Sequence, residues 1–460
     1  MPPPPNTLPS SLRSLPSVRQ TTSLLLKHAS HLKHFSVDLS AIDEVVNQVL
    51  GLIRRDYPAP SAIPFHSRWR HFDSASEKRV EKYLFLGGGS SVDSNVDSKV
   101  DANEKVRRVL DLFVVSVLLD AGAGAKWKYK FERDGTTNSI RSEGLALASL
   151  AWFLDGAFSL DPSNPLRVDA AKLSTLSLKD LHTAFQVSPE NPLEGDIGRL
   201  SLLTRLGTVL TSPETAHFFY NKQNNDYRPG NMLDYVLSHA KQSGQTKSVD
   251  VSVLWSVVMD GLSGVWPATR TTLDGISLGD VWPSQAIHSI FQKESVRIEG
   301  IPKDAHLQNL HVVAFHKLSQ WLTYSLMEPF SLVGVKFEGL DVMTGLAEYR
   351  NGGLFVELDM NVITLKKETL ERGLANAKTA GVPRFEVFDD AVVEWRGLTV
   401  ALLDLVGERV QKALGMSKDE LPLVKVLEAG TWKLGREVAA KLRPDTKGPP
   451  IEIISDGTVF

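Results

Sequence analysis

Apolar residues recur every three or four positions along much of the chain, which is the spacing of helices that bury one face. Residues 21–56 are predicted to form two helices, and the second carries the apolar stripe Ile42, Val45, Val46 and Leu50. The apolar run in residues 106–119 is nearly continuous and predicts a buried helix. Further helices are predicted after Arg141 and from Glu394 to Leu405. The pattern therefore favours a chain built mainly from helices.

The spacing of apolar residues in 312–327 predicts another helix, with one apolar face and one polar face. One face is an apolar stripe made by Phe315, Leu318, Leu322 and Leu326. The other face carries Lys317, Gln320 and Tyr324 at the same spacing, so these polar side chains are predicted to point together. This combination places reactive groups against an apolar core.

A polar segment follows that helix and leads into a double glycine. Glu348, Tyr349, Arg350 and Asn351 precede Gly352–Gly353, and we expect these residues to form a loop. Two glycines allow the backbone to turn sharply or to approach a ligand closely. The alternative is a core helix followed by a surface loop in which Glu348 and Arg350 form an ion pair. Spacing alone does not exclude that alternative.

The remaining segments complete the expected architecture. Residues 1–20 are rich in proline and serine and predict a disordered tail, and residues 87–105 are low in complexity and predict a flexible loop. Short strands are predicted at residues 272–280 and 451–454. No alternation of strands and helices appears, so we expect one mainly α-helical domain over residues 21–460 with a few short strands.

Composition excludes several classes of function. The chain has 460 residues, no cysteine and a formal net charge of −3. The absence of cysteine excludes disulfides, thiolate catalysis and cysteine-bound metals, and the charge gives no reason to expect nucleic acid or a membrane as the partner. No apolar run is long enough to span a bilayer, and no secretory signal is evident. We expect a cytoplasmic protein, with the nucleus as the alternative.

Charged residues near aromatic or apolar segments are candidates for ligand binding. Arg68 and Arg70 flank Trp69, and two such guanidiniums could bind a phosphate or carboxylate; a surface loop with arginines stacked on tryptophan is the alternative. Asp120 ends the buried helix, where it could cap or bind a substrate, and Asp38 lies at the joint of the first two helices. His66 and His71 lack metal-ligand spacing, so no metal is expected.

Several long segments resemble the uracil catabolism protein 4 family of fungi and bacteria. They extend from Phe65 to Phe460 and include HSRWRHF, LLDAGAG, RSEGLALASL, FHKLSQWLTYSLMEP, GLAEYRNGGLFVEL, EWRGLTVALLDLV and SDGTVF. The resemblance implies a place in a pathway that degrades uracil through its nucleotide, opens the ring and releases urea from a ribosylurea-type intermediate.

A more distant resemblance bears on the chemistry. The order Phe315-His316-Lys317, Glu348-Tyr349-Arg350 and Glu394-Trp395-Arg396 is similar to motifs of the queuosine-nucleotide N-glycosidases. Those proteins are helical, are related in fold to helix-hairpin-helix DNA glycosylases, and cleave the bond between C1′ and a base nitrogen. Glutamate replaces their aspartate here, and Asn351-Gly352-Gly353 replaces their Val-Pro-Gln, so the reach of the carboxylate and the pocket shape are expected to differ.

These resemblances imply an N-glycosidase that releases urea from ribosylurea, with a 5′-phosphorylated substrate expected and no cofactor. Glu348 and Lys317 are the candidate catalytic residues. The candidate substrate-binding residues are His316, Gln320, Tyr349, Arg350, Asn351, Glu394, Arg68, Arg70, Asp120 and Asp38. Two alternatives stay open, namely an amidohydrolase or ring-opening enzyme of the same pathway and a non-catalytic ligand-binding protein. The sequence does not predict the oligomeric state.

Overall fold

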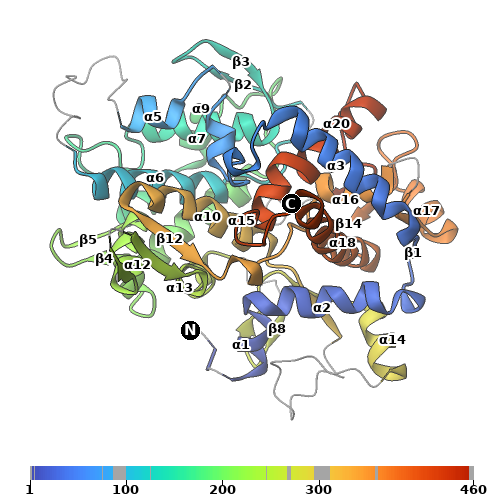
Figure 1. Ribbon diagram of the computed structural model, residues 1–460. Coiled ribbons are helices and arrows are strands. Elements are labelled where there is room, and N and C mark those ends of the chain that lie inside the picture. The colour runs from blue at the N-terminus through green and yellow to red at the C-terminus, as the bar shows by residue number, and fades with distance from the viewer. Residues whose placement is uncertain are drawn as a thin grey trace.

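Helices dominate the computed structural model, and the strands are short, as the hydrophobic pattern predicts (Figure 1). The structure describes residues 3–4, 6–74, 76–85, 100–124, 126–244, 246–266, 271–294, 311–357 and 361–454. Residues 87–99 of the predicted loop and the terminal segment 455–460 lie outside these ranges. Within the described residues, no helix is both long enough and apolar enough to cross a membrane.

The helices have the following bounds. They are α1 (Leu8–Leu12), α2 (Leu15–Lys27), α3 (Ile42–Asp56), α4 (Trp69–Phe72), α5 (Arg79–Leu84), α6 (Ala102–Leu118), α7 (Arg141–Leu154), α8 (Ala170–Leu173), α9 (Leu178–Ala184), α10 (Asp196–Leu210), α11 (Ala216–Phe219), α12 (Met232–Ser238), α13 (Val251–Ser256), α14 (Gln285–Lys293), α15 (Lys317–Phe330), α16 (Tyr349–Glu357), α17 (Lys367–Leu374), α18 (Asp390–Leu414), α19 (Leu423–Val426) and α20 (Trp432–Leu442).

The strands pair locally and over long distances in sequence. Antiparallel pairs are β1 (Phe35–Val37) with β13 (Ile363–Leu365), β2 (Tyr129–Phe131) with β3 (Thr136–Ser139), β4 (Tyr220–Asn221) with β5 (Asp226–Tyr227), β8 (Thr272–Leu273) with β9 (Ile276–Ser277), and β10 (Val281–Pro283) with β11 (Val312–Ala314). Strand β7 (Thr246–Asp250) pairs with β6 (Lys241–Ser243) and, in parallel, with β12 (Val335–Glu338), and β14 (Arg384–Glu386) pairs in parallel with β15 (Glu452–Ile454). The strands expected at residues 272–280 and 451–454 are thereby confirmed.

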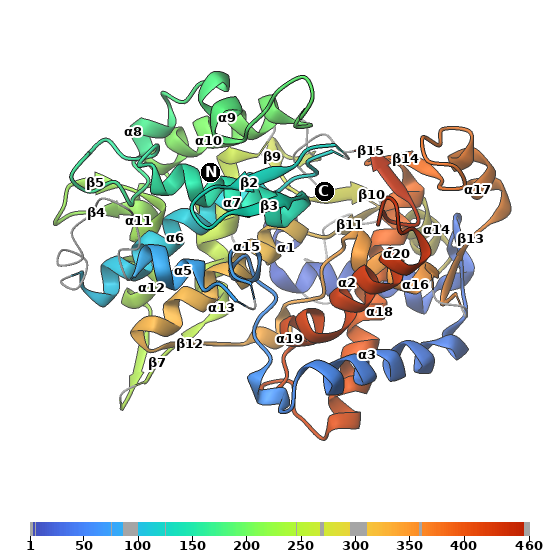
Figure 2. The same cartoon turned by 90° about the horizontal axis from the view of Figure 1, so that it is seen from above.

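Helix α15 lies at the centre of the arrangement. The helices from the middle of the chain, among them α6, α7 and α10, lie on one side of it, and α16, α18 and α20 lie on the other with the N-terminal helices (Figures 1 and 2). Helix α6 is buried along most of its length from Val106 onward, where most of its side chains are apolar, and α18 packs against α2. One large apolar cluster joins all of these helices. The start of α15 therefore lies where the two sides meet.

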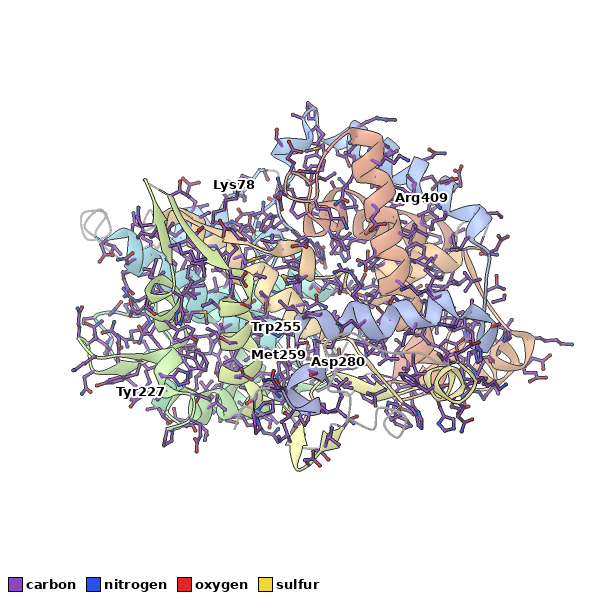
Figure 3. The ribbon with its side chains drawn as sticks, turned by 60° about the horizontal axis from the view of Figure 1, so that its bottom comes forward. Lys78, Tyr227, Trp255, Met259, Asp280 and Arg409 are labelled. Carbon is purple, nitrogen blue, oxygen red and sulfur yellow. The ribbon has the colours of Figure 1, made fainter. Side chains whose placement is uncertain are left out.

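The N-terminal segment is ordered, and the prediction of a disordered tail at residues 1–20 is wrong for residues 8–20. Helices α1 and α2 form there because Thr7 caps α1 and because Leu12, Leu15 and Val18 supply buried apolar contacts. The carbonyl of Leu12 accepts a hydrogen bond from Nε2 of His316 at 2.8 Å. The segment crosses the region of Trp255, Met259 and Asp280, which lie near one another in Figure 3. Proline and serine composition thus concealed a packed segment.

Three further boundaries differ from the predictions. Residues 102–105 belong to α6, because Asp101 caps that helix through the N–H of Glu104, so they are not part of a flexible loop. Residues 312–314 form strand β11, and the helix begins only at Lys317. The segment 349–353, expected as a loop, is the first part of helix α16. The first and third differences depend on helix caps, Asp101 for α6 and Glu348 for α16. The second depends on pairing of β11 with the distant strand β10.

Candidate active site

A cavity of about 630 Å³ opens where the two sides of the molecule meet. Its wall is built from the segment after α6, the start of α7, the starts of α15 and α16, and one face of α20. Helix α15 lies between α7 on one side and α16 and α20 on the other (Figure 2). Five of the predicted site residues line this cavity, namely Asp120, Lys317, Glu348, Tyr349 and Arg350.

Glu348 is fixed by the start of α16. Its carboxylate accepts the backbone N–H of Arg350 at 2.7 Å and that of Asn351 at 2.5 Å, which is the geometry of a helix cap. The side chain is buried, with the residue 8% exposed. Burial raises the pKa of Glu348, while the two backbone N–H groups and Lys317 oppose this shift. The alternative was a surface ion pair between Glu348 and Arg350. Among the described residues, the carboxylate of Glu348 is not within 4.0 Å of the Arg350 guanidinium.

Lys317 extends into the same cavity from the first turn of α15. Its backbone N–H donates to Oδ2 of Asp280 at 3.0 Å, and Asp280 in turn forms an ion pair with Arg396 at 2.7 Å. The ammonium group lies 5.9 Å from the centre of the Trp321 ring. Burial lowers the pKa of Lys317, while Glu348 and Asp120 oppose the shift. Within the described part of the chain no carboxylate lies within 4.0 Å of this ammonium group, so its N–H donors can serve a ligand.

Asp120 also faces the cavity, and Arg68 holds it in place. Oδ1 of Asp120 lies 2.9 Å from the guanidinium of Arg68, and Oδ2 accepts the hydroxyl of Ser142 at 3.1 Å. Arg68 is fully buried and donates from Nε to Ser116 at 2.8 Å. Arg68 therefore does not line the cavity, and the structure does not bring it together with Lys317 and Glu348.

Arg70, the second arginine of the predicted anion grip, also has an internal partner. Its guanidinium forms an ion pair with Glu328 at 2.7 Å, and it does not line the cavity. Arg68 and Arg70 therefore do not bind one anion together, because they pair with two separate carboxylates, Asp120 and Glu328.

Histidine and tryptophan side chains also line the cavity, namely His66, His71, Trp321 and Trp432. They were not among the predicted site residues. Nδ1 of His66 lies 2.7 Å from Oε2 of Glu428. His71 accepts a hydrogen bond from Arg68 at 3.3 Å, and burial together with Arg68 lowers its pKa to about 4, so it is neutral near pH 7. The rings of Trp321 and Trp432 lie 5.7 and 5.9 Å from His71. These residues provide aromatic surfaces beside Lys317.

Four other candidates lie behind the cavity wall or away from it. Gln320 donates to Thr344 at 2.9 Å, Asn351 accepts the hydroxyl of Thr431 at 2.9 Å, and His316 bonds to Leu12. Glu394 accepts the backbone N–H groups of Lys33, His34 and Phe35 at 2.7–2.9 Å. These side chains position the segments that carry Lys317 and Glu348, or anchor β1, and the structure gives them no place in the wall of the 630 Å³ cavity.

Asp38 is exposed and caps the short 3-10 helix Leu39–Ala41. Its carboxylate accepts the hydroxyl of Ser40 at 2.6 Å. It does not line the cavity. No group of three or more His, Cys, Asp or Glu side chains within the described ranges is placed to hold a metal ion.

Comparison with known proteins covers nearly the whole chain. A family model with the description "Protein of unknown function (DUF1688)" matches residues 11–460. The protein named "Uracil catabolism protein 4" from Lachancea kluyveri is 41% identical over 463 residues, which cover 98% of each chain. "Protein urg3" from Schizosaccharomyces pombe is 38% identical over 459 residues, again 98% of each chain. The match to the family model includes the last two residues of α1 and all of α2.

Proposed function

Since the chain belongs to the DUF1688 family, with uracil catabolism protein 4 among its relatives, we propose that it acts in uracil catabolism as an N-glycosidase. The substrate is ribosylurea or its 5′-phosphate, and the products are urea and the sugar. One observation carries the proposal. Glu348 and Lys317 line the same cavity, and burial shifts their pKa values toward each other, that of Glu348 upward and that of Lys317 downward.

Glu348 is the group that stabilises the transition state. When the C1′–N bond breaks, the electron pair leaves with the nitrogen and positive charge develops at C1′ and the ring oxygen. A buried carboxylate stabilises that charge and accepts a proton from the attacking water, whose oxygen bonds to C1′. Because burial raises its pKa, Glu348 is a stronger base than an exposed glutamate.

Lys317 supplies the proton that the departing urea nitrogen requires. A poor leaving group needs protonation by a positioned acid. Since burial lowers its pKa, the Lys317 ammonium gives up a proton more readily than an exposed lysine does. After one turnover Glu348 has gained a proton and Lys317 has lost one, so proton transfer from the carboxylic acid to the amine restores both groups.

The shape of the site supports a small ribosyl substrate. Trp321, Trp432 and Tyr349 line the cavity and offer ring faces that exclude water from the reacting bond. A volume of about 630 Å³ is within the range of small-molecule sites. The helical fold agrees with the expected relationship to helix-hairpin-helix N-glycosidases, which is part of this proposal.

The test is release of urea by the purified full-length protein from synthetic ribosylurea, with and without the 5′-phosphate. We expect turnover with at least one of the two substrates, and we expect Glu348→Gln to lower kcat roughly a hundredfold. Binding of both compounds without urea release would instead favour a ligand-binding protein. Consumption of a ring-closed or ring-opened pyrimidine nucleotide without cleavage of its N-glycosidic bond would favour an amidohydrolase.

A further inference from the structure

Two guanidinium groups on the cavity wall are held by one short backbone segment. Arg141 donates to the carbonyls of Lys447 and Thr446 at 2.9 and 2.6 Å. Arg350 donates to the same carbonyl of Lys447 at 2.8 Å. A guanidinium has five N–H donors, so each arginine keeps donors that these carbonyls do not use. Arg141, Arg350 and Lys447 all line the cavity.

The positive charge of these two arginines is not balanced by an ion pair. Within the described part of the chain, neither Arg141 nor Arg350 has a carboxylate within 4.0 Å. The neighbouring Glu143 is paired with Arg436 at 2.7 Å, and Glu348 accepts two backbone N–H groups. Arg350 and Arg436 both lower the pKa of Arg141, in the same direction as burial. This part of the cavity wall therefore carries clustered positive charge.

The backbone at this point is also strained. Arg141 has φ +54° and Lys447 has φ +47°, both in the left-handed region that residues other than glycine rarely adopt. Such residues are energetically unfavourable, and they cluster at active sites and ligand-binding sites. Arg141 and Lys447 are joined by the hydrogen bond described above. Two of the ten non-glycine residues with positive φ in the described part of the chain therefore meet at this hydrogen bond.

We propose that Arg141 and Arg350, with the ammonium of Lys447, form an anion site that binds the phosphate of a 5′-phosphorylated ribosyl substrate. A phosphate monoester has several acceptor oxygens and carries close to two negative charges, so it matches two guanidiniums that approach from different elements. The inference rests on the proposed function in one respect, the ribosyl part of the ligand. It also replaces Arg68 and Arg70 as the predicted anion grip.

The position of the site relative to Glu348 fits this substrate. Glu348 caps α16, and Arg350 is the second residue of the same helix, so both are fixed by one helix start. Glu348 is buried and Lys317 is half-buried on the cavity wall, while Lys447 is exposed. A substrate bound by its phosphate at Arg141 and Arg350 therefore lies in the same cavity as the carboxylate of Glu348.

The experiment measures binding of ribose 5-phosphate and of ribose to the full-length protein by calorimetry. The variant Arg141→Asn removes the charge and keeps a residue that tolerates left-handed backbone. Arg350→Met is the second variant, and thermal melting checks that each protein folds. Arg133→Asn removes a surface arginine paired with Asp155 and serves as the control for net charge. If Arg350→Met does not fold, Arg141→Asn decides the test alone.

We expect the wild-type protein and the control to bind ribose 5-phosphate at least tenfold more tightly than ribose, and each test variant to lose most of that difference. Equal binding of ribose and ribose 5-phosphate by the wild type would overturn the anion site. Equal weakening of both ligands by Arg141→Asn would also overturn it, because the residue would then act on folding alone.

The binding experiment tests the anion site independently of the proposed N-glycosidase activity, because binding of ribose 5-phosphate requires no cleavage. Arginine-dependent binding in a protein that releases no urea would keep the anion site and reject the N-glycosidase. Urea release at equal kcat/KM from the phosphorylated and unphosphorylated substrates would keep the N-glycosidase and reject the anion site.

Discussion

At the scale of single residues, Glu348 uses one carboxylate for two purposes. It caps α16 through two backbone N–H groups, and it lies on the cavity wall. A substitution that removes the charge and the cap together would lower both stability and activity, and loss of a cap alone costs about 1 kcal/mol. A substitution of Glu348 therefore isolates the effect of its charge on activity only when the new side chain still caps α16.

The first residue-scale prediction concerns Lys317 and Glu348 as a pair. Lys317→Ala and Glu348→Gln should each lower kcat for urea release by roughly a hundredfold. The double variant should lose less than the product of the two single effects, because each group depends on the other during the same step. Steady-state kinetics of the three proteins checks this. Fully multiplicative effects would show that the two groups act independently.

The second prediction is the pH dependence of kcat/KM. Activity requires ionised Glu348, whose pKa is raised from 4.5, so the acid limb should fall with an apparent pKa above 4.5. Activity also requires protonated Lys317, whose pKa is lowered from 10.5, so the alkaline limb should fall with an apparent pKa below 10.5. The acid limb should disappear from the residual activity of Glu348→Gln. An acid limb unchanged in that variant would assign it to another group.

Part of the site could be predicted from sequence, and the missed part has a physical reason. Glu348 and Lys317 were selected from the double glycine, the helical spacing and the resemblance to the N-glycosidase motifs, and Asp120 because it ends a buried helix beside glycines. His71 and Trp321 were missed because aromatic residues at helical spacing are usual in a core. The ion pair of Arg68 was missed because its partner, Asp120, lies 52 residues away in the sequence, and no local pattern reports such a pair.

At the scale of elements, the start of α16 depends on close contact with α20. A Cβ atom at Gly435 of α20 would lie 2.2 Å from the backbone oxygen of Arg350. Gly435→Ala should therefore displace the start of α16, lower the free energy of unfolding by about 1–3 kcal/mol and raise KM. Denaturant unfolding and steady-state kinetics measure both effects.

A matched control for this prediction is Gly51→Ala in α3. No atom lies within 4 Å of the Cβ that would be added there. Alanine in an exposed helix interior should stabilise the protein by roughly 0.5–1 kcal/mol and leave KM unchanged. If Gly435→Ala behaved like Gly51→Ala, the site would not depend on the contact between α16 and α20.

The elements show where local pattern fails to predict structure. Helices α3 and α6 follow from their apolar stripes, but β11 was taken for helix because its partner β10 lies far from it in sequence. Helix α16 was taken for a loop because Gly352 and Gly353 each disfavour a helix by about 1 kcal/mol. The missing side chain at Gly352 permits contact with α18, since a Cβ there would lie 2.8 Å from the Trp395 ring. Packing overrides the local preference.

At the scale of the whole molecule, the N-terminal segment packs behind the start of α15, which carries Lys317. Arg13 donates to the carbonyl of Ser277 and to Asp260, each at 2.9 Å, and its own carbonyl accepts the indole N–H of Trp255 at 3.1 Å. Leu12 contacts His316, the residue before Lys317. These contacts connect α1 to the start of α15.

Deletion of residues 1–20 should therefore destabilise the protein by on the order of 5 kcal/mol or more, because it removes several buried apolar side chains as well as these hydrogen bonds. Thermal melting followed by circular dichroism measures the effect. Deletion of residues 1–6, which ends before the cap of α1 at Thr7, is the control and should leave the melting temperature unchanged. A melting temperature unaffected by the longer deletion would support the tail that composition predicted.

The central claim is that the charge of Glu348, and not only its cap, drives release of urea. Asp and Asn are both good helix caps, so Glu348→Asp and Glu348→Asn should melt at the same temperature while differing in charge. The decisive measurement is kcat for urea release by Glu348→Asn. We predict a decrease of roughly a hundredfold or more from the wild-type value, without loss of melting temperature relative to Glu348→Asp. A Glu348→Asn protein that releases urea at the wild-type rate would contradict the account and leave Glu348 as a helix cap alone.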